Sequence, residues 1–245
     1  MEFIWPEDVD KVQTYISTKE EGDLSFKWGN DEKVVVENRI KCLSGLALNI
    51  NDLVTCNQPH SNNVIIVGSE SVGRGAKQKD WLIGCDGLVT KDKDIILGIE
   101  TADCIPIFLF DPINKVVGLA HAGWRGVVGN IVSELIDQAI KLGAQVDLIK
   151  VAIGPHIQSC CFKVQGNVAD EFKKILDGSV SEKEGRLHVD LQKVVFYQLT
   201  GVGVSVENIS ASNECTSCLK DKYYSFRRDK DECAGSMLSV IKLKL

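Results

Sequence analysis

Residues 104–121 read Cys-Ile-Pro-Ile-Phe-Leu-Phe-Asp-Pro-Ile-Asn-Lys-Val-Val-Gly-Leu-Ala-His. Two apolar runs, 105–110 and 115–120, are separated by a segment that begins Asp-Pro, which is typical of a type I turn. The pattern predicts a β-hairpin centred on this segment. In that register Cys104 and His121 lie opposite each other, with Cβ atoms about 4.5–5.5 Å apart.

This predicted pairing can form part of a metal site. A thiolate and an imidazole at such a distance can bind one Zn²⁺, since Zn–S is about 2.3 Å and Zn–N about 2.1 Å. The alternative is a half-buried Cys and His without a metal. For a third ligand the residues leave His60, in a turn-like loop, and His156, at a strand end, as equal candidates, whereas His188 lies in a charged stretch and is expected in solvent. Three protein ligands leave a fourth position open, as in catalytic zinc sites.

Charged residues near the predicted metal suggest what surrounds it. Segment 118–126, Gly-Leu-Ala-His-Ala-Gly-Trp-Arg-Gly, is predicted to lead from the second strand into a helix, whose first N–H groups favour an anion. Arg125 adds a guanidinium suited to phosphate or carboxylate, and the alternative is a surface arginine in a plain connection. Asp103 and Asp86 are expected to orient a ligand histidine or to transfer protons.

The rest of the chain alternates between strands and helices. Apolar patterning predicts helices at 33–42, 129–142, 167–176 and 189–199, and strands at 64–67, 95–98, 148–153 and 237–243. Interleaved elements together with a hairpin predict an α/β or α+β fold with layered mixed sheets. Because the sequence shows no repeat and no linker, a single domain over residues 1–245 is expected.

Composition excludes several classes of protein. Hydrophobic residues make up 44% and charged residues 25%, which is typical of a globular chain with a full core. The net charge of -6 disfavours binding to nucleic acid or to an anionic membrane, and no apolar run approaches the roughly 18 residues that span a bilayer. The N-terminus does not resemble a signal peptide, and the odd number of cysteines favours a reducing cytoplasm.

Five cysteines lie in the C-terminal half of the chain. Cys215 and Cys218 have C-x-x-C spacing, Cys160 and Cys161 are adjacent, and Cys233 follows. A second zinc site and a redox pair are both conceivable, but reduced structural thiols are the favoured interpretation, because no second pair has the spacing of a known site.

The motifs around the predicted metal site resemble a bacterial family. It was first described as multicopper polyphenol oxidoreductases or laccases, and it is now regarded as purine nucleoside phosphorylases with adenosine deaminase activity. The segments Thr-Ala-Asp-Cys at 101–104 and His-Ala-Gly-Trp-Arg-Gly at 121–126 carry the resemblance, which covers most of the chain. Further similar segments are Asn38-Arg39, Gln58-Pro59-His60, 86–90, 153–155 with Cys160-Cys161, Cys215-Thr216 and 225–229. The chain departs from the family at His156, Lys163 and Ser236.

The resemblance implies an α/β/β/α fold and a zinc ion held by His60, Cys104 and His121. It also implies a phosphorylase for adenosine and inosine, with methylthioadenosine as a further candidate, that deaminates adenosine. A nucleoside and phosphate would then be the binding partners, and the oligomeric state is left open. Side chains expected to bind the substrate or phosphate are Asn38, Arg39, Arg125 and Arg227, and Asp103 or Asp86 would move protons.

Three other functions fit parts of the sequence. Cu²⁺ is the alternative metal, and it would make the chain a polyphenol oxidase. However, a laccase needs several copper ions and many histidines, and this chain has four. Cys104 and His121 are also the residue types of a hydrolase with a cysteine nucleophile. A zinc-stabilised binding module is the third alternative, which failure to turn over any nucleoside would favour.

Overall fold

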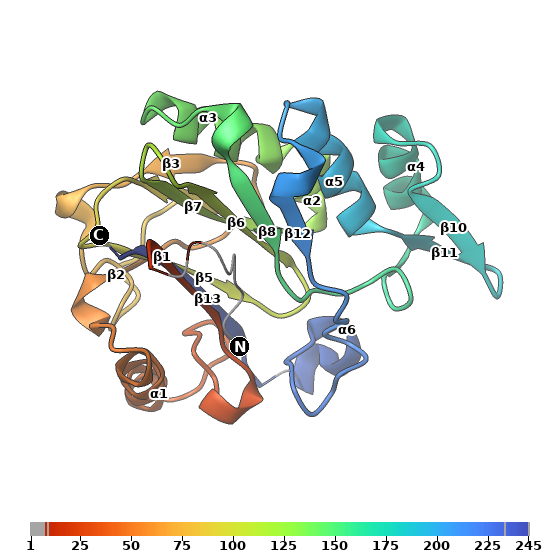
Figure 1. The fold of residues 1–245 in the computed structure, drawn as a ribbon. Helices are drawn as coiled ribbons and strands as arrows, with labels where there is room; N and C mark the ends of the chain where they lie inside the picture. Colours follow the sequence, from red (N-terminus) through yellow and green to blue (C-terminus); the bar gives the residue numbers. More distant parts are fainter. Residues whose placement is uncertain (1–7, 9, 233, 245) are drawn as a thin grey trace.

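Two β-sheets stacked face to face form the centre of the protein, with helices on the outer face of each (Figure 1). The structure is a computed structural model that describes residues 8, 10–232 and 234–244. The strands are β1 (Val12–Ile16), β2 (Leu53–Thr55), β3 (Val64–Ile66), β4 (Gly87–Thr90), β5 (Ile96–Thr101), β6 (Ile105–Asp111), β7 (Val116–Ala122), β8 (Lys150–Ile153), β9 (Lys163–Val164), β10 (Val180–Lys183), β11 (Arg186–Val189), β12 (Ile209–Ala211) and β13 (Met237–Leu243). The α-helices are α1 (Glu32–Gly45), α2 (Trp124–Val128), α3 (Ile131–Lys141), α4 (Gly166–Ile175), α5 (Leu191–Gly201) and α6 (Phe226–Asp229).

The larger sheet has the order β12-β8-β6-β7-β4-β3 and the smaller one β1-β13-β5-β2. Both are mixed, because β12 with β8, β3 with β4 and β2 with β5 are parallel pairs, whereas the other pairs are antiparallel. A third, antiparallel sheet has the order β10-β11-β9. The predicted class of layered mixed sheets is confirmed.

Side-chain alternation in the central hairpin separates the layers. Phe108 and Phe110 of β6 are buried between the two sheets, and Ile107 and Leu109 of the same strand are buried in the cluster beneath α3 and α5. A further apolar cluster, which includes Leu43, lies under α1 on the outer face of the smaller sheet. The layers of the fold are therefore stacked in the order α/β/β/α, as the resemblance implies. Each fully buried side chain of this size contributes about 1.5–3 kcal/mol.

The register of the hairpin differs from the prediction. His121 pairs with Pro106 and not with Cys104, which lies just before β6, and Asp111 pairs with Val116. The loop therefore has four residues, and the centre of the hairpin moves by one position. A shift of two residues in the partner keeps the same face of the strand. The expectation that Cys104 and His121 lie on one side of the sheet consequently survives the wrong register.

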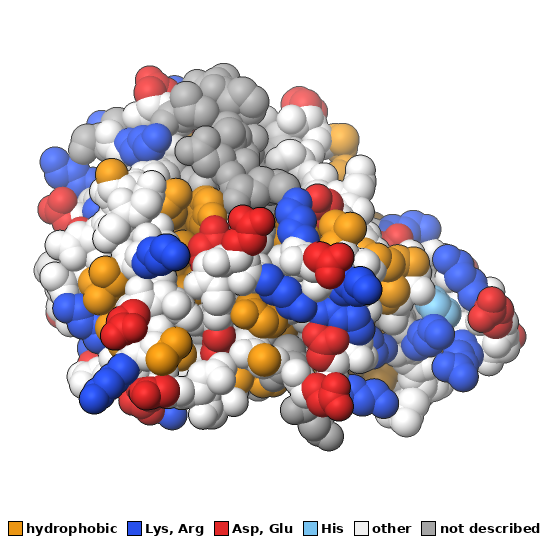
Figure 2. Space-filling model, turned by 90° about the horizontal axis from the view of Figure 1, so that it is seen from below, with side chains coloured by type: hydrophobic (Ala, Val, Ile, Leu, Met, Phe, Trp, Pro, Cys, Tyr) orange, Lys and Arg blue, Asp and Glu red, His pale blue; other side chains and the backbone are white. Residues whose placement is uncertain are grey.

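The surface seen from below carries acidic and basic side chains interspersed over the body of the molecule (Figure 2). The net charge of -6 is thus not gathered into one acidic patch on this face. Within the described residues, the helices all fall short of the combined length and hydropathy that crossing a membrane requires.

Candidate metal centre and pocket

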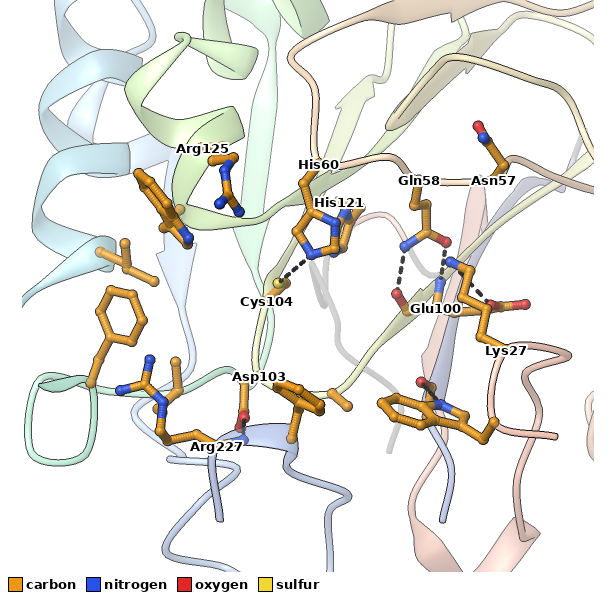
Figure 3. A pocket seen from close by; sticks show the side chains of 18 of the residues that line it. Lys27, Asn57, Gln58, His60, Glu100, Asp103, Cys104, His121, Arg125 and Arg227 are labelled. Carbon is orange, nitrogen blue, oxygen red and sulfur yellow. Dashed lines mark hydrogen bonds and ion pairs between the residues drawn. The ribbon is translucent and has the colours of Figure 1, made fainter. Parts of the chain in front are cut away.

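Three residues from separate parts of the chain meet beside a cavity. His60 lies in the loop between β2 and β3, Cys104 lies where the chain passes from β5 to β6, and His121 lies near the end of β7. Their ligand atoms are all within 4.8 Å of one another. Cys104 Sγ is 3.9 Å from His60 Nε2, and the two imidazole rings meet edge-on with centroids 4.8 Å apart (Figure 3). The structure thus brings together the three predicted ligands, which we call the triad.

A glycine makes this close approach possible. A Cβ at Gly123 would lie 2.7 Å from Cδ2 of His60 and 3.4 Å from Sγ of Cys104. Real side chains do not tolerate the first of these distances, so any larger residue would push the His60 ring out of place. The Gly-Trp-Arg segment is therefore part of the site's geometry.

Asp86 holds the triad from behind. Its Oδ1 is 2.8 Å from Nδ1 of His121 and accepts the backbone N–H of His60, while its Oδ2 accepts both the backbone N–H and the hydroxyl of Ser61. Burial raises the pKa of Asp86, but the hydrogen bonds from His121 and Ser61 outweigh it and the net pKa is lowered. Asp86 is fully buried and outside the cavity lining. Of the two roles expected of it, these contacts favour orientation of His121, which stays a prediction.

Burial sets the protonation of the three donors. It lowers the pKa of His121 to about 4, although the hydrogen bond to Asp86 acts in the opposite direction, and it also lowers the pKa of His60. Both imidazoles are therefore neutral near pH 7, which is the form that binds a metal. Burial and the charges of Asp103 and Asp86 raise the pKa of Cys104 to about 12. A cation at the triad would be needed to stabilise the thiolate at neutral pH.

Asp103 lies beside Cys104 in a strained conformation. Its φ is +95°, in the region that residues other than glycine rarely adopt. Its Oδ1 accepts the hydroxyl of Thr216 at 2.6 Å, and its Oδ2 accepts the backbone N–H of Arg227 at 2.6 Å. Strain of this kind clusters at functional sites. Because both oxygens already have donors, Asp103 joins the turn before Cys104 to the C-terminal segment.

The triad opens into a cavity of about 690 Å³. Its lining combines tryptophan and phenylalanine rings, three cationic side chains and two carboxylates. The rings are Trp28, Trp81, Trp124, Phe162 and Phe226, the cations are Lys27, Arg125 and Arg227, and the carboxylates are Glu100 and Asp103. Arg125 and Arg227 lie on one side of the triad, and Lys27 and Glu100 lie on the other (Figure 3). Each arginine stacks on a ring, Arg125 on Trp124 at 4.4 Å and Arg227 on Phe162 at 5.0 Å.

Two residues expected to bind substrate lie elsewhere. Arg39 is fully buried and outside the cavity lining; its guanidinium donates to backbone carbonyls of Leu24 and Gly75 and forms an ion pair with Glu100. Asn38 donates to the backbone carbonyl of Asp23 and is likewise outside the lining. These two expectations are corrected accordingly: Arg39 supports the pocket wall through Glu100, Asn38 holds the backbone of Asp23, and neither lines the cavity.

Sequence reasoning missed the side of the pocket built by Lys27 and Glu100. Lys27 Nζ is 3.4 Å from Glu100 Oε2, and Gln58 forms two hydrogen bonds with the backbone of Glu100. A lone carboxylate at the end of the apolar strand β5 was the available signal for Glu100. Lys27 and the neighbouring tryptophans carry no local signal, because the long-range packing of the smaller sheet brings them to the cavity.

The other two histidines are occupied away from the triad. His156 is fully buried, and its Nδ1 donates to the carbonyl of Gly154 at 2.8 Å. His188 is also buried, with Nδ1 donating to the carbonyl of Ser159 at 2.7 Å, so its expected exposure to solvent is wrong. Of the two candidates for the third metal ligand, His60 and His156, only His60 therefore lies at the triad.

Comparison with known proteins places these features in a family. A sequence model described as "multi-copper polyphenol oxidoreductase laccase" matches residues 13–244. The chain belongs to this family. Its expected resemblance is thereby confirmed.

Relatives in the family carry enzyme names. The chain is 35% identical to "Adenosine deaminase RL5" from an unknown prokaryotic organism, over 82% of this chain and 79% of that protein. It is also 35% identical to "Purine nucleoside phosphorylase YlmD" of Geobacillus stearothermophilus, over 89% of this chain and 82% of that protein. The crystal structure of YlmD from the same organism superposes with a TM-score of 0.90 at 31% identity, covering 96% of this chain and 92% of that one. A hypothetical protein, YfiH of Bacillus licheniformis, superposes with a TM-score of 0.91 at 30% identity, covering 95% and 93%.

Proposed function

We propose that this protein is a zinc-dependent purine nucleoside phosphorylase that acts on adenosine and inosine, with methylthioadenosine as a further substrate, and that it also deaminates adenosine. The observation that carries the proposal is the cavity itself. It combines a three-ligand metal triad, aromatic walls and cationic side chains in one space of a size typical of small-molecule sites. The names of the relatives support both activities.

The donor set fits zinc. Two imidazole nitrogens and one thiolate are ligands that zinc accepts, and a tetrahedral ion would place such a sulfur and nitrogen about 3.6 Å apart, near the 3.9 Å between Cys104 and His60. Asp86 behind His121 supplies the carboxylate–histidine arrangement of zinc sites. A bound zinc ion supplies Lewis-acid activation of water or of a substrate oxygen.

Arg125 and Arg227 are the candidates to hold phosphate. In phosphorolysis, phosphate attacks C1′ of the ribose while the base leaves, so negative charge must be held at the attacking phosphate and at the departing purine. Both guanidiniums are exposed within the cavity and lie on the same side of the triad (Figure 3). Guanidiniums match phosphate with paired hydrogen bonds, and two of them can orient the nucleophile.

The aromatic walls suit the flat base. Trp28 and Phe226 lie with ring centroids 6.0 Å apart and line the cavity, and Trp28 is fixed by a hydrogen bond of its indole N–H to Ser236. A purine stacks readily on such rings, which also exclude water. Glu100, held by Arg39 and Ser25, and Lys27 beside it are the charged groups on this wall. They are the candidates to hold or move a proton at the purine nitrogens.

Two rival functions are less well supported. A multicopper oxidase needs several histidine-rich metal sites, yet two of the four histidines are buried in hydrogen bonds away from the triad. A cysteine hydrolase needs an activated thiolate, whereas burial raises the pKa of Cys104 to about 12. The third rival, a non-catalytic binding module, is distinguished from an enzyme by the activity measurement below.

The deciding experiment follows the products formed from inosine and adenosine. With phosphate present, we expect inosine to give hypoxanthine and ribose 1-phosphate, and without phosphate we expect no cleavage. Adenosine should also give inosine in phosphate-free buffer, which reports deamination. Cys104→Ala should lose both activities, and Cys42→Ser, a buried cysteine in α1, should keep them. Free ribose formed equally fast without phosphate would reject phosphorolysis, and turnover of neither nucleoside would favour the binding module.

A further inference from the structure

Four cysteines from two distant segments meet at one edge of the larger sheet. Cys160 and Cys161 follow β8, and Cys215 and Cys218 follow β12. These strands are parallel neighbours, so the segments that leave their carboxyl ends emerge side by side. The pairing continues past the strands, since the backbone N–H of Thr216 donates to the carbonyl of His156 at 3.1 Å. The register of the sheet therefore brings the four thiols together.

The sulfur atoms are spaced for a single metal ion. All four lie within 4.8 Å of one another, with 3.4 Å between Cys161 and Cys218, 3.7 Å between Cys160 and Cys218, and 3.8 Å between Cys160 and Cys161. A tetrahedron with Zn–S bonds of 2.3 Å has sulfur–sulfur edges of about 3.8 Å. A disulfide needs about 2.05 Å instead. An iron–sulfur cluster would separate some of the cysteines further, because the four sulfurs are then divided between two or four irons.

Polar groups surround the C-x-x-C turn of this group of cysteines. The backbone N–H of Gln158 points at Sγ of Cys215, with 3.4 Å between nitrogen and sulfur. The guanidinium of Arg228, which is ion-paired with Asp229, donates to the carbonyls of Thr216 and Ser217 and so fixes the C-x-x-C turn. Four thiolates and one divalent ion carry a net charge of about -2, which such donors stabilise.

We propose that Cys160, Cys161, Cys215 and Cys218 form a second metal site, the four-cysteine cluster, which binds one structural zinc ion. Four protein ligands close the coordination shell, so the ion has no open position for catalysis. Soft thiolates in tetrahedral arrangement select zinc or iron over harder cations, and the spacing fits a single ion. This site stands apart from the triad, and it depends neither on the nucleoside chemistry nor on the metal in the pocket.

The position of the cluster indicates what the ion would do. Ile157 and Phe162, which flank the adjacent cysteines, line the catalytic cavity. Thr216, between the other two cysteines, donates to Asp103 at 2.6 Å. A metal that fastens the two segments would therefore fix one wall of the pocket and the strained turn before Cys104. Structural zinc contributes directly to the free energy of folding.

The test is a metal count on the full-length chain, purified under reducing conditions without added metal. We expect about two zinc ions per chain, one at each site. Cys218→Ser, chosen because Cys218 is exposed, should lose one of them, and Cys104→Ala should lose the other. Cys42→Ser is the matched control and should retain both. Unchanged zinc content in Cys218→Ser would overturn the assignment. So would a wild-type chain in which the metal lost on this substitution is iron and not zinc.

Three further measurements keep the proposal testable if a variant folds poorly. Cobalt(II) added to metal-free Cys104→Ala should give the intense charge-transfer bands of a tetrathiolate site, and their absence counts against the cluster. Thiol titration of the unreduced, unfolded wild type should find all nine cysteines of the chain. Two missing thiols that peptide mapping assigns to the cluster would show a disulfide there and reject a resident metal. Chelation should lower the Tm of Cys104→Ala and leave the Tm of a Cys104→Ala/Cys218→Ser double variant unchanged.

Discussion

Asp86 and His121 are joined twice, once by side chains and once by backbone. Nδ1 of His121 lies 2.8 Å from Oδ1 of Asp86, and the backbone N–H of His121 donates to the backbone carbonyl of Asp86 at 2.7 Å. Because a carboxylate can only accept, the ring proton is on Nδ1, and the lone pair of Nε2 is left for a metal. Asp86, the residue just before β4, thus fixes both the position and the tautomer of His121.

Replacing Asp86 by Asn tests this arrangement. The amide keeps the shape of the side chain but loses the charge that holds the tautomer, so we expect zinc affinity of the triad to fall by roughly 10–100-fold. Chelator competition measures it, with Cys104→Ala defining the share of zinc that belongs to the triad. Asp111→Asn, which removes a buried carboxylate at the far end of the hairpin, is the matched control. Equal affinities in the Asp86 variant and the wild type would contradict the orienting role.

Gly123→Ala tests the close approach at the triad. The new Cβ would lie 2.7 Å from the His60 ring, and relief of such overpacking costs about 1–3 kcal/mol. We expect zinc affinity to fall by roughly 5–150-fold while the fold is retained. Gly166→Ala is the control, since no atom lies within 4 Å of a Cβ placed there. Zinc content and circular dichroism of the two variants check the prediction; a Gly123→Ala protein that binds zinc normally would show that His60 can move aside.

Much of the fold was predictable because its patterns are local. The apolar runs of the hairpin, the periodicity of α3 and the strand β13 depend on neighbouring residues, and all appear as expected. The short strands β1, β2 and β12 escaped prediction, since they are stabilised by pairing with distant strands and carry little pattern of their own. The hairpin register was wrong because the side chain of Asp111 organises a loop of four residues.

The site divides in the same way. Cys104 and His121 could be placed on one face from the hairpin alone, whereas the residues left His60 and His156 undecided. The third ligand reaches the triad through a loop anchored by Asp86, and no local pattern encodes that contact. Arg39 illustrates the opposite error, because this residue of a motif that resembles a substrate-binding pair is fully buried and ion-paired with Glu100.

Asp111 gives a prediction about acid stability. Burial raises its pKa, but hydrogen bonds from Asn114 and Gln145 outweigh this and the net pKa lies below the ordinary value. A lowered folded-state pKa means that the carboxylate stabilises the fold above pH ~4 and that this contribution is lost as the pH falls through the folded-state pKa. Asp111→Asn should therefore lower the free energy of unfolding at pH 7 by about 1.5–3 kcal/mol, and by less at pH 3.

Urea denaturation of the wild type and the variant at both pH values measures the difference. Asp94→Asn, at an exposed position in the turn before β5, is the control and should change stability little at either pH. A loss that is the same at pH 7 and pH 3 would show that the side chain acts through its shape and not through its charge.

Arg125→Lys separates phosphate binding from the other roles of the pocket. The helix α2 that begins beside it has only five residues, so the anion affinity expected of a helix start falls mainly to the guanidinium itself. Lysine keeps the positive charge but loses the paired hydrogen bonds and the stacking on Trp124. We expect the apparent phosphate KM to rise by roughly ten- to a hundred-fold, about 1.4 kcal/mol for each tenfold step.

Zinc content should stay normal in Arg125→Lys, and deamination should suffer less than phosphorolysis, because deamination consumes water in place of phosphate. Arg74→Lys, outside the cavity, is the matched control. The decisive quantity is the ratio of phosphorolysis to deamination in the same preparation: an equal loss of both activities, or a loss of zinc, would mean that Arg125 shapes the site without binding phosphate.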